Sequence, residues 1–286
     1  MTLIPDPQAP WWAHAFATTV QKGARDVELD RAVILLSAHR SALVPSNRAV
    51  ERELAKLDEI AVACRPATFD GWQRQLFVEL GLAGNGADYH DVRNSFLPDV
   101  VARRVGIPVS LSVIGIEVGR RLGLSMWGVG MPGHFLLGHG PTVPGRRRRD
   151  EPVPEGTVFV DAFNGGAVLD VEGCTSLFRR FHGEAQPFDL SFLAPIDSHM
   201  ILVRMLANLK SNYARARDIE GLAAVLRLRA CLPGLSLDEA RELVRLLDAT
   251  GRVGEAWNTL DLITPLYPNA TDVLRAERDR IASRLN

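Results

Sequence analysis

A serine, a histidine and an aspartate occur along the chain in the order that acyl-transfer chemistry uses. Ser110 lies near the start of an apolar segment, His134 follows in the motif Pro-Gly-His-Phe, and Asp161 ends a short apolar run. In such a triad the acid orients the imidazole, the imidazole accepts a proton, and a nucleophile attacks a carbonyl carbon. No cysteine lies near the start of the apolar segment, so Ser110 is the candidate nucleophile.

Each of these three residues also has an ordinary structural explanation. Ser110 near a helix start is a natural cap, because its side-chain oxygen accepts a backbone N–H. His134 can be hydrogen-bonded in a turn, and Asp161 can begin the Asn-Gly-Gly turn that follows it. The residues alone leave open whether Ser110 is a nucleophile or a helix cap.

The element that must position Ser110 is a helix over residues 109–122. Its apolar residues cover most of the circumference, which predicts burial on all sides. Pro108 suits the first turn, because a proline there lacks only a donor that has no partner within the helix. Glu117 is the one carboxylate in this segment, and Arg120 and Arg121 are its expected partners.

Strands are expected to position His134 and Asp161, over residues 126–131, 135–138 and 158–161. If the last two pair as an antiparallel hairpin with Leu137 opposite Val158, His134 lies opposite Asp161. Their Cβ atoms are then about 5 Å apart. A histidine beside a carboxylate has one ring nitrogen fixed and the other free for chemistry.

Helical periodicity dominates both ends of the chain. Apolar residues recur every three or four positions over residues 29–38, 48–62 and 69–80, and regular stripes resume after residue 198. Pro233 and Pro268 each end a similar stretch and are 35 residues apart, close to the ~34-residue period of tetratricopeptide hairpins. A plain helical bundle explains the same pattern. We therefore predict an α+β domain over 1–197 and an all-α region over 198–286.

Composition excludes several classes of protein. The formal net charge of −1 argues against a nucleic-acid partner or an anionic membrane surface. The basic run 146–149 is followed by acidic residues and is interpreted as a solvated loop tip. No segment approaches ~20 uninterrupted apolar residues, and no signal peptide is evident. Three widely spaced cysteines indicate reduced thiols and a cytoplasmic location.

Two alternative sites are less favoured by the sequence. Cys174 lies near a predicted helix start, where its pKa could be lowered, but it follows the acid in sequence. His134, His139 and Asp161 could in principle bind zinc, but His139 falls between two glycines in an apparent loop. Cys64 and Cys231 occupy helical stripes and are interpreted as core residues. We expect no metal and no cofactor.

Several motifs in order resemble the SirB family of the transglutaminase-like superfamily, whose members often end in tetratricopeptide-like helices. The matching stretches are 89–97, 103–112, 119–124, 132–136 and 161–166. The resemblance implies a papain/transglutaminase-like fold in which His134 is the histidine and Asp161 the acid. In that superfamily a cysteine begins the buried helix, and here the corresponding stretch 108–112 offers only Ser110 and Ser112. The resemblance also places Asn94 and Arg93 near the cleft.

Three functional hypotheses follow. The leading one is a non-catalytic binding or regulatory protein that holds a peptide or acyl group near His134 and Asp161 and recruits a protein partner through its helical tail. The second is a serine-dependent amide or ester hydrolase, or acyltransferase, with a Ser110–His134–Asp161 triad. The third is a structural scaffold that acts through the tail alone.

Overall fold

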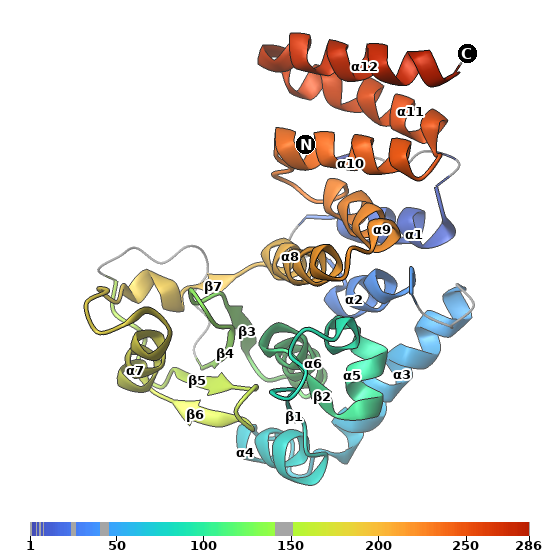
Figure 1. The fold of residues 1–286 in the computed structure, drawn as a ribbon. Coiled ribbons are helices and arrows are strands. Elements are labelled where there is room, and N and C mark those ends of the chain that lie inside the picture. Colours follow the sequence, from blue (N-terminus) through green and yellow to red (C-terminus); the bar gives the residue numbers. More distant parts are fainter. Residues whose placement is uncertain are drawn as a thin grey trace.

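The structure is a computed structural model that describes residues 2, 3, 5, 7, 9–23, 27–40, 46–140 and 151–285. It is mostly helical, with a small sheet near the middle of the chain and a stack of helices at its C-terminal end (Figure 1). The helices before the stack are α1 (Trp11–Val20), α2 (Leu29–Ser37), α3 (Asn47–Ala63), α4 (Phe69–Gln73), α5 (Leu97–Arg103), α6 (Pro108–Arg121) and α7 (Val171–His182). The stack comprises α8 (Ser198–Ala216), α9 (Ile219–Ala230), α10 (Leu237–Ala249), α11 (Val253–Ile263) and α12 (Thr271–Leu285).

The predicted helices of the first hundred residues are confirmed to within one or two residues, with one difference. The segment predicted as one helix over 69–80 is α-helical only as α4, and it continues as a π-helix over Arg74–Glu79. The predicted basic loop tip at 146–149 lies outside the described residues. None of the helices in the described ranges is both long and apolar enough to cross a lipid bilayer.

The described residues form one antiparallel sheet with the strand order β6-β5-β4-β3-β7. Its strands are β3 (Met126–Val129), β4 (Leu136–His139), β5 (Val158–Asp161), β6 (Ala167–Leu169) and β7 (Pro195–Ile196). A separate parallel pair joins β1 (Ala83–Gly84) to β2 (Val105–Gly106), next to the start of α6. All strands are short, so helices must cover the sheet to stabilise it.

Side chains alternate between the two faces of the sheet, and each face has its own core. Leu137 and Val160 point into the main core with α6, whereas Leu136 and Phe159 point into a smaller core with α7. The sheet therefore lies between the buried helix α6 and the amphipathic helix α7 (Figure 1). This arrangement confirms the predicted α+β fold with a buried central helix and a small antiparallel sheet.

The predicted strand register is wrong by two residues. Leu137 pairs with Val160, and Val158 pairs with His139. A shift of two residues leaves every side chain on the same face, so burial alone does not distinguish the two registers. Asp161 still ends β5, but His134 precedes β4 in a turn, and the two residues are not a directly opposed pair.

The buried helix α6 carries the expected charge cluster. Glu117 contacts Arg120 at 2.8 Å and Arg121 at 3.2 Å, as predicted, and both arginines also contact the buried Asp30 of α2. Burial, together with the charge of Asp30, raises the pKa of Glu117 to about 7 in spite of the two arginines. Burial also acts to raise the pKa of Asp30, but hydrogen bonds from Arg121 and the Arg31 backbone outweigh it and lower that pKa.

The helical stack shares its core with the rest of the molecule. The main core extends through α8 and α9 to Leu232, and a second cluster begins at Leu226 and continues to Ile281. Leu3, whose N–H donates to the Ala230 carbonyl, joins this second cluster. The domain boundary at 198 stays a prediction, because apolar packing is continuous across it.

We predict that Glu117→Gln changes how stability depends on pH. The pKa of Glu117 is raised from 4.5 in a free carboxyl to about 7 in the fold, so the folded state binds the proton more tightly. The stability that this protonation contributes is fully present below about pH 4.5 and is lost as pH rises through about 7. Between pH 5 and pH 8 the unfolding free energy of the natural protein should fall by about 2–3 kcal/mol relative to E117Q, as measured by urea unfolding. Parallel pH profiles for the two proteins would contradict the assignment.

Candidate functional site

His134 and Asp161 form a buried hydrogen-bonded pair. The Nε2 atom of His134 lies 2.9 Å from Oδ1 of Asp161, and the two residues are 5% and 2% exposed. Their contact was predicted from the sequence, although the strand register used for that prediction is wrong. His134 is in a turn in which Gly133 has φ +77°, a conformation that favours glycine.

Both oxygens of the Asp161 carboxylate accept hydrogen bonds. Besides His134, the backbone N–H groups of Phe163 and Asn164 donate to Oδ1, and the Asn164 side-chain amide donates to Oδ2 at 2.6 Å. Burial acts to raise the pKa of Asp161, but the hydrogen bonds from His134 and Asn164 outweigh it and lower that pKa. An ionised carboxylate only accepts hydrogen bonds, so Nε2 of His134 carries the proton and Nδ1 of the neutral ring is an acceptor.

His134 lines a cavity of about 710 Å³. The cavity lies between the start of α6, the segment before α5 and the C-terminal half of α7. Phe181 of α7 stacks on the imidazole with ring centroids 5.5 Å apart, and Phe163 contacts it edge-on. The remaining lining residues are Gly86, Tyr89, His90, Pro108, Gly133, Asn164, Leu177 and Arg180.

Pro108, and not Ser110, is the residue from the start of α6 that lines this cavity. Ser110 is fully buried, and its hydroxyl donates to the Asn94 carbonyl at 2.6 Å and accepts the N–H of Ile107 at 3.1 Å. Those contacts are those of a helix cap. Ser112 is also fully buried, and its hydroxyl has no hydrogen-bond partner among the described residues.

Asn94 does not line the cavity but supports one of its walls. It is fully buried, its amide donates to the carbonyls of Asp88 and Tyr89, and its Oδ1 accepts from Asn85. It thereby holds the segment that carries Tyr89 and His90 into the cavity. Arg93, in contrast, pairs with Asp91 and lines a different cavity.

His90 ties the cavity to the helical stack. Its Nδ1 lies 3.1 Å from Oδ1 of Asn212, and Arg215 donates to its Nε2 at 3.2 Å. Both partners belong to α8. One wall of the cavity is therefore anchored to the helices that follow the sheet.

The thiol of Cys174 has a raised pKa, contrary to the expectation from its place near a helix start. Cys174 lies in the first turns of α7, as expected, but burial and the charges of Asp170 and Asp161 raise the pKa of its thiol to about 12. A lowered pKa at this helix start is therefore wrong. Burial likewise raises the pKa of Cys64, and that of Cys231 to about 12.

His139 is committed to other contacts. It lies in β4, where its ring stacks on Phe69 at 4.6 Å and its Nδ1 contacts the Ser125 carbonyl. In the part of the chain that the structure describes, no three histidine, cysteine or acidic residues are grouped so that they could hold a metal ion.

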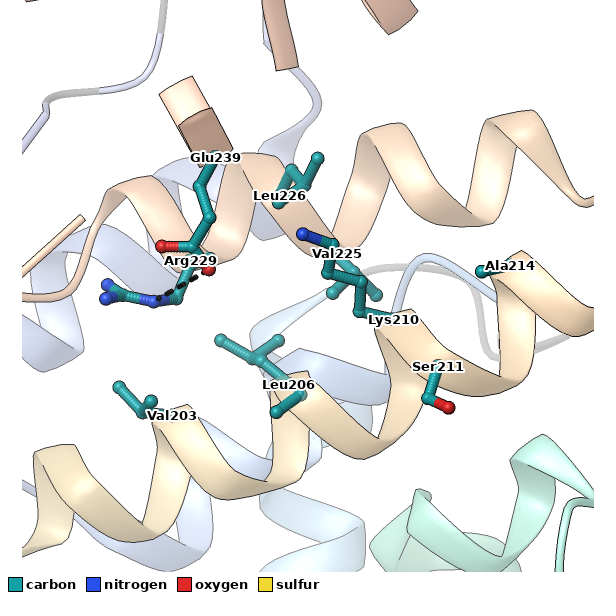
Figure 2. A pocket seen from close by; sticks show the side chains of 10 residues that line it. Val203, Leu206, Lys210, Ser211, Ala214, Val225, Leu226, Arg229 and Glu239 are labelled. Carbon is teal, nitrogen blue, oxygen red and sulfur yellow. Dashed lines mark ion pairs between the residues drawn. The ribbon is translucent and has the colours of Figure 1, made fainter. Parts of the chain in front are cut away.

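A second, more apolar cavity of about 290 Å³ lies within the helical stack. Figure 2 shows Val203 and Leu206 of α8 below Val225 and Leu226 of α9. Arg229 of α9 and Glu239 of α10 also line this cavity, and they form an ion pair at 3.6 Å.

Residues 47–207 match the family model of the transglutaminase-like superfamily. The chain belongs to the transglutaminase-like superfamily. This transglutaminase-like region includes the whole His134 cavity and the first half of α8. It confirms the superfamily part of the resemblance drawn from the motifs.

The relatives include bacterial and animal proteins. A UPF0162 protein of Xylella fastidiosa is 36% identical over 231 residues, which are 78% of this chain and 76% of that protein. A UPF0162 protein of Vibrio cholerae is 29% identical over 165 residues, or 58% of this chain and 56% of that one. F-box only protein 21 of Homo sapiens is 29% identical over 205 residues, which cover 72% of this chain but 26% of that protein. No solved structure matches the chain.

Sequence reasoning missed the residues that complete the cavity. Tyr89 and His90 begin one of the matching motifs, so a signal for them existed. Phe163 follows Asp161 in another motif, and it packs edge-on against His134. Arg180 and Phe181 had no signal beyond helical periodicity, because only the docking of α7 brings them to His134.

We predict that Ser110→Ala lowers the unfolding free energy of this transglutaminase-like protein by about 1–2 kcal/mol. The substitution removes a buried hydroxyl that both donates and accepts, leaving the Ile107 N–H with only a long contact to Asn94. Ser112→Ala is the matched control. Its hydroxyl is equally buried without a described partner, so its loss should cost little or be stabilising. Urea unfolding of both variants checks the prediction, and equal losses would contradict it.

Proposed function

We propose that this protein is a SirB-type, transglutaminase-like binding or regulatory protein without a working nucleophile, which holds a peptide or acyl group in the His134 cavity. The observation that carries the proposal is Pro108. It lines the cavity with His134 at the start of α6, where the superfamily resemblance calls for a cysteine. A proline side chain has no atom that can attack a carbonyl carbon.

The remaining pair suits recognition. With Nε2 held by Asp161, the neutral imidazole offers Nδ1 as an acceptor for a ligand N–H. Phe163 and Phe181 pack against the imidazole, and apolar surface of this kind beside a hydrogen bond strengthens it. A peptide or acyl amide supplies both the N–H and the apolar surface that this cavity accommodates.

The alternative, a serine-dependent hydrolase or acyltransferase with Ser110 as nucleophile, is less well supported. The Ser110 hydroxyl is bound on both sides, and an attack would require its two partners to be left unsatisfied. It has no described hydrogen bond with His134. In the binding hypothesis His134 binds the ligand and Asp161 orients the imidazole. In the serine-enzyme hypothesis His134 is the general base and Asp161 is the acid that orients it.

The second part of the proposal concerns the helical stack, which we infer recruits a protein partner in the cytoplasm. Its apolar cavity between α8 and α9 supports this inference. The spacing of the helices supports a tetratricopeptide-like character: α9 and α11 begin at Ile219 and Val253, 34 residues apart, and α10 and α12 at Leu237 and Thr271, also 34 residues apart.

We predict that the natural protein forms no covalent adduct with a panel of activated acyl esters, as measured by intact mass spectrometry. An adduct that maps to Ser110, together with turnover that disappears in both Ser110→Ala and His134→Ala, would establish the serine enzyme and overturn the binding proposal.

The variant Pro108→Cys tests the geometry behind this prediction. A thiol at the first turn of α6 beside an imidazole should have a lowered pKa, because the helix dipole and the ring both favour the thiolate. Its alkylation by iodoacetamide at pH 6.5 should be at least about tenfold faster than in the double variant P108C/H134Q. Equal rates in the two proteins would mean that Pro108 does not occupy the nucleophile position.

A further inference from the structure

We propose that the His134 cavity selects a peptide segment that carries a carboxylate, bound by Arg180, beside an aromatic or aliphatic side chain held by Tyr89, Phe163 and Phe181. This inference rests on the proposed binding function and adds the chemical class of the ligand.

The first observation is a cation that no described acid neutralises. Arg180 lines the cavity from α7, and no ion pair or hydrogen bond joins its guanidinium to another described residue. Its neighbour Arg179 contacts Glu184 at 3.6 Å and does not line the cavity. An arginine offers a planar pair of N–H groups that matches the two oxygens of a carboxylate.

The second observation is the absence of a competing negative charge. None of the residues that line the cavity, all of them within 86–134 or 163–181, is acidic. Asp161 lies behind His134, is 2% exposed and already accepts hydrogen bonds at both oxygens. The first turn of α6, the positive end of the helix dipole, opens on the same cavity at Pro108. The electrostatic preference of the cavity is thus for an anion.

The third observation is exposed aromatic surface at the rim. Tyr89 is 41% exposed and Phe181 is 54% exposed, and both line the cavity. Large aromatic side chains exposed at a concave site are typical of recognition surfaces. A volume of about 710 Å³ accommodates a short peptide segment with one large side chain.

A carboxylate fits better than a phosphate group. Sites for phosphorylated peptides use clusters of arginines, whereas one arginine reaches this cavity. His134 adds no donor for the anion, because its ring N–H at Nε2 is already bonded to Asp161. The single guanidinium of Arg180 beside apolar walls suits a carboxylate, which carries a charge of −1.

The test uses the chain of residues 1–286 and three families of N-acetyl tripeptides that contain phenylalanine. One family has a free C-terminal carboxylate, the second has the same sequences with a C-terminal amide, and the third is amidated but contains an internal glutamate. The first and third families distinguish a chain terminus from an acidic side chain as the source of the carboxylate. Affinities are measured by isothermal titration calorimetry.

We predict that at least one of the two families that carry a carboxylate, the first or the third, binds at least about tenfold more tightly than the second family, which carries none. A tenfold ratio corresponds to about 1.4 kcal/mol. Arg180→Gln should remove this difference and leave the affinity for the amidated peptides within about twofold. Arg179→Gln is the matched control, because it removes the same charge one residue away and should leave the preference intact. Both arginines are exposed, so both variants should fold, as thermal melts will verify.

Other outcomes overturn the inference. Equal affinities for carboxylate and amidated peptides would refute carboxylate selection while leaving peptide binding in the cavity intact. Equal losses in the Arg180 and Arg179 variants would attribute the effect to general charge. Stronger competition by inorganic phosphate or by a phosphoserine tripeptide would assign the site to phosphate. No binding by any family would refute both the selection and the proposed function.

Discussion

The buried carboxylate of Asp161 is the constraint on which the candidate site depends. A negative charge that is 2% exposed must be compensated by donors, and four hydrogen bonds from three residues do so. Two of those donors are backbone N–H groups that define the turn after β5, and a third is the imidazole of His134. The same group therefore sets the path of the chain, the orientation of the histidine and the direction in which its free nitrogen points.

A second constraint operates at the start of α6. A helix begins with N–H groups that lack partners within the helix, and here the hydroxyl of Ser110 bonds the N–H of Ile107 while it donates to Asn94. Asn94 in turn holds the segment that carries Tyr89 and His90. Ser110, the nucleophile candidate of the sequence, thus connects the start of α6 to the cavity wall. The residue of α6 that lines the cavity is Pro108, whose side chain has no nucleophilic atom.

The helical stack is part of this arrangement. Apolar packing is continuous from α6 through α8 and α9, and His90 reaches across to Asn212 and Arg215 on α8. A ligand that displaces the segment around Tyr89 therefore acts on a wall that α8 supports. The superfamily match, which ends within α8, follows the same continuity.

Local sequence determined most of the longer elements, because helix and strand periodicities, the first-turn proline at 108 and the partners of Glu117 depend on residues close in the chain. Motif order also indicated the pair of His134 and Asp161. The strand register was not determined, because registers two residues apart bury the same faces and the connection between β4 and β5 is too long to act as a tight turn. Only the tertiary structure decided that Pro108 rather than Ser110 meets the cavity and that α7 brings Arg180 and Phe181 to His134. Which side of α6 faces the cavity, and where α7 packs, are set by contacts between residues that are distant in the chain. No local sequence pattern encodes such contacts.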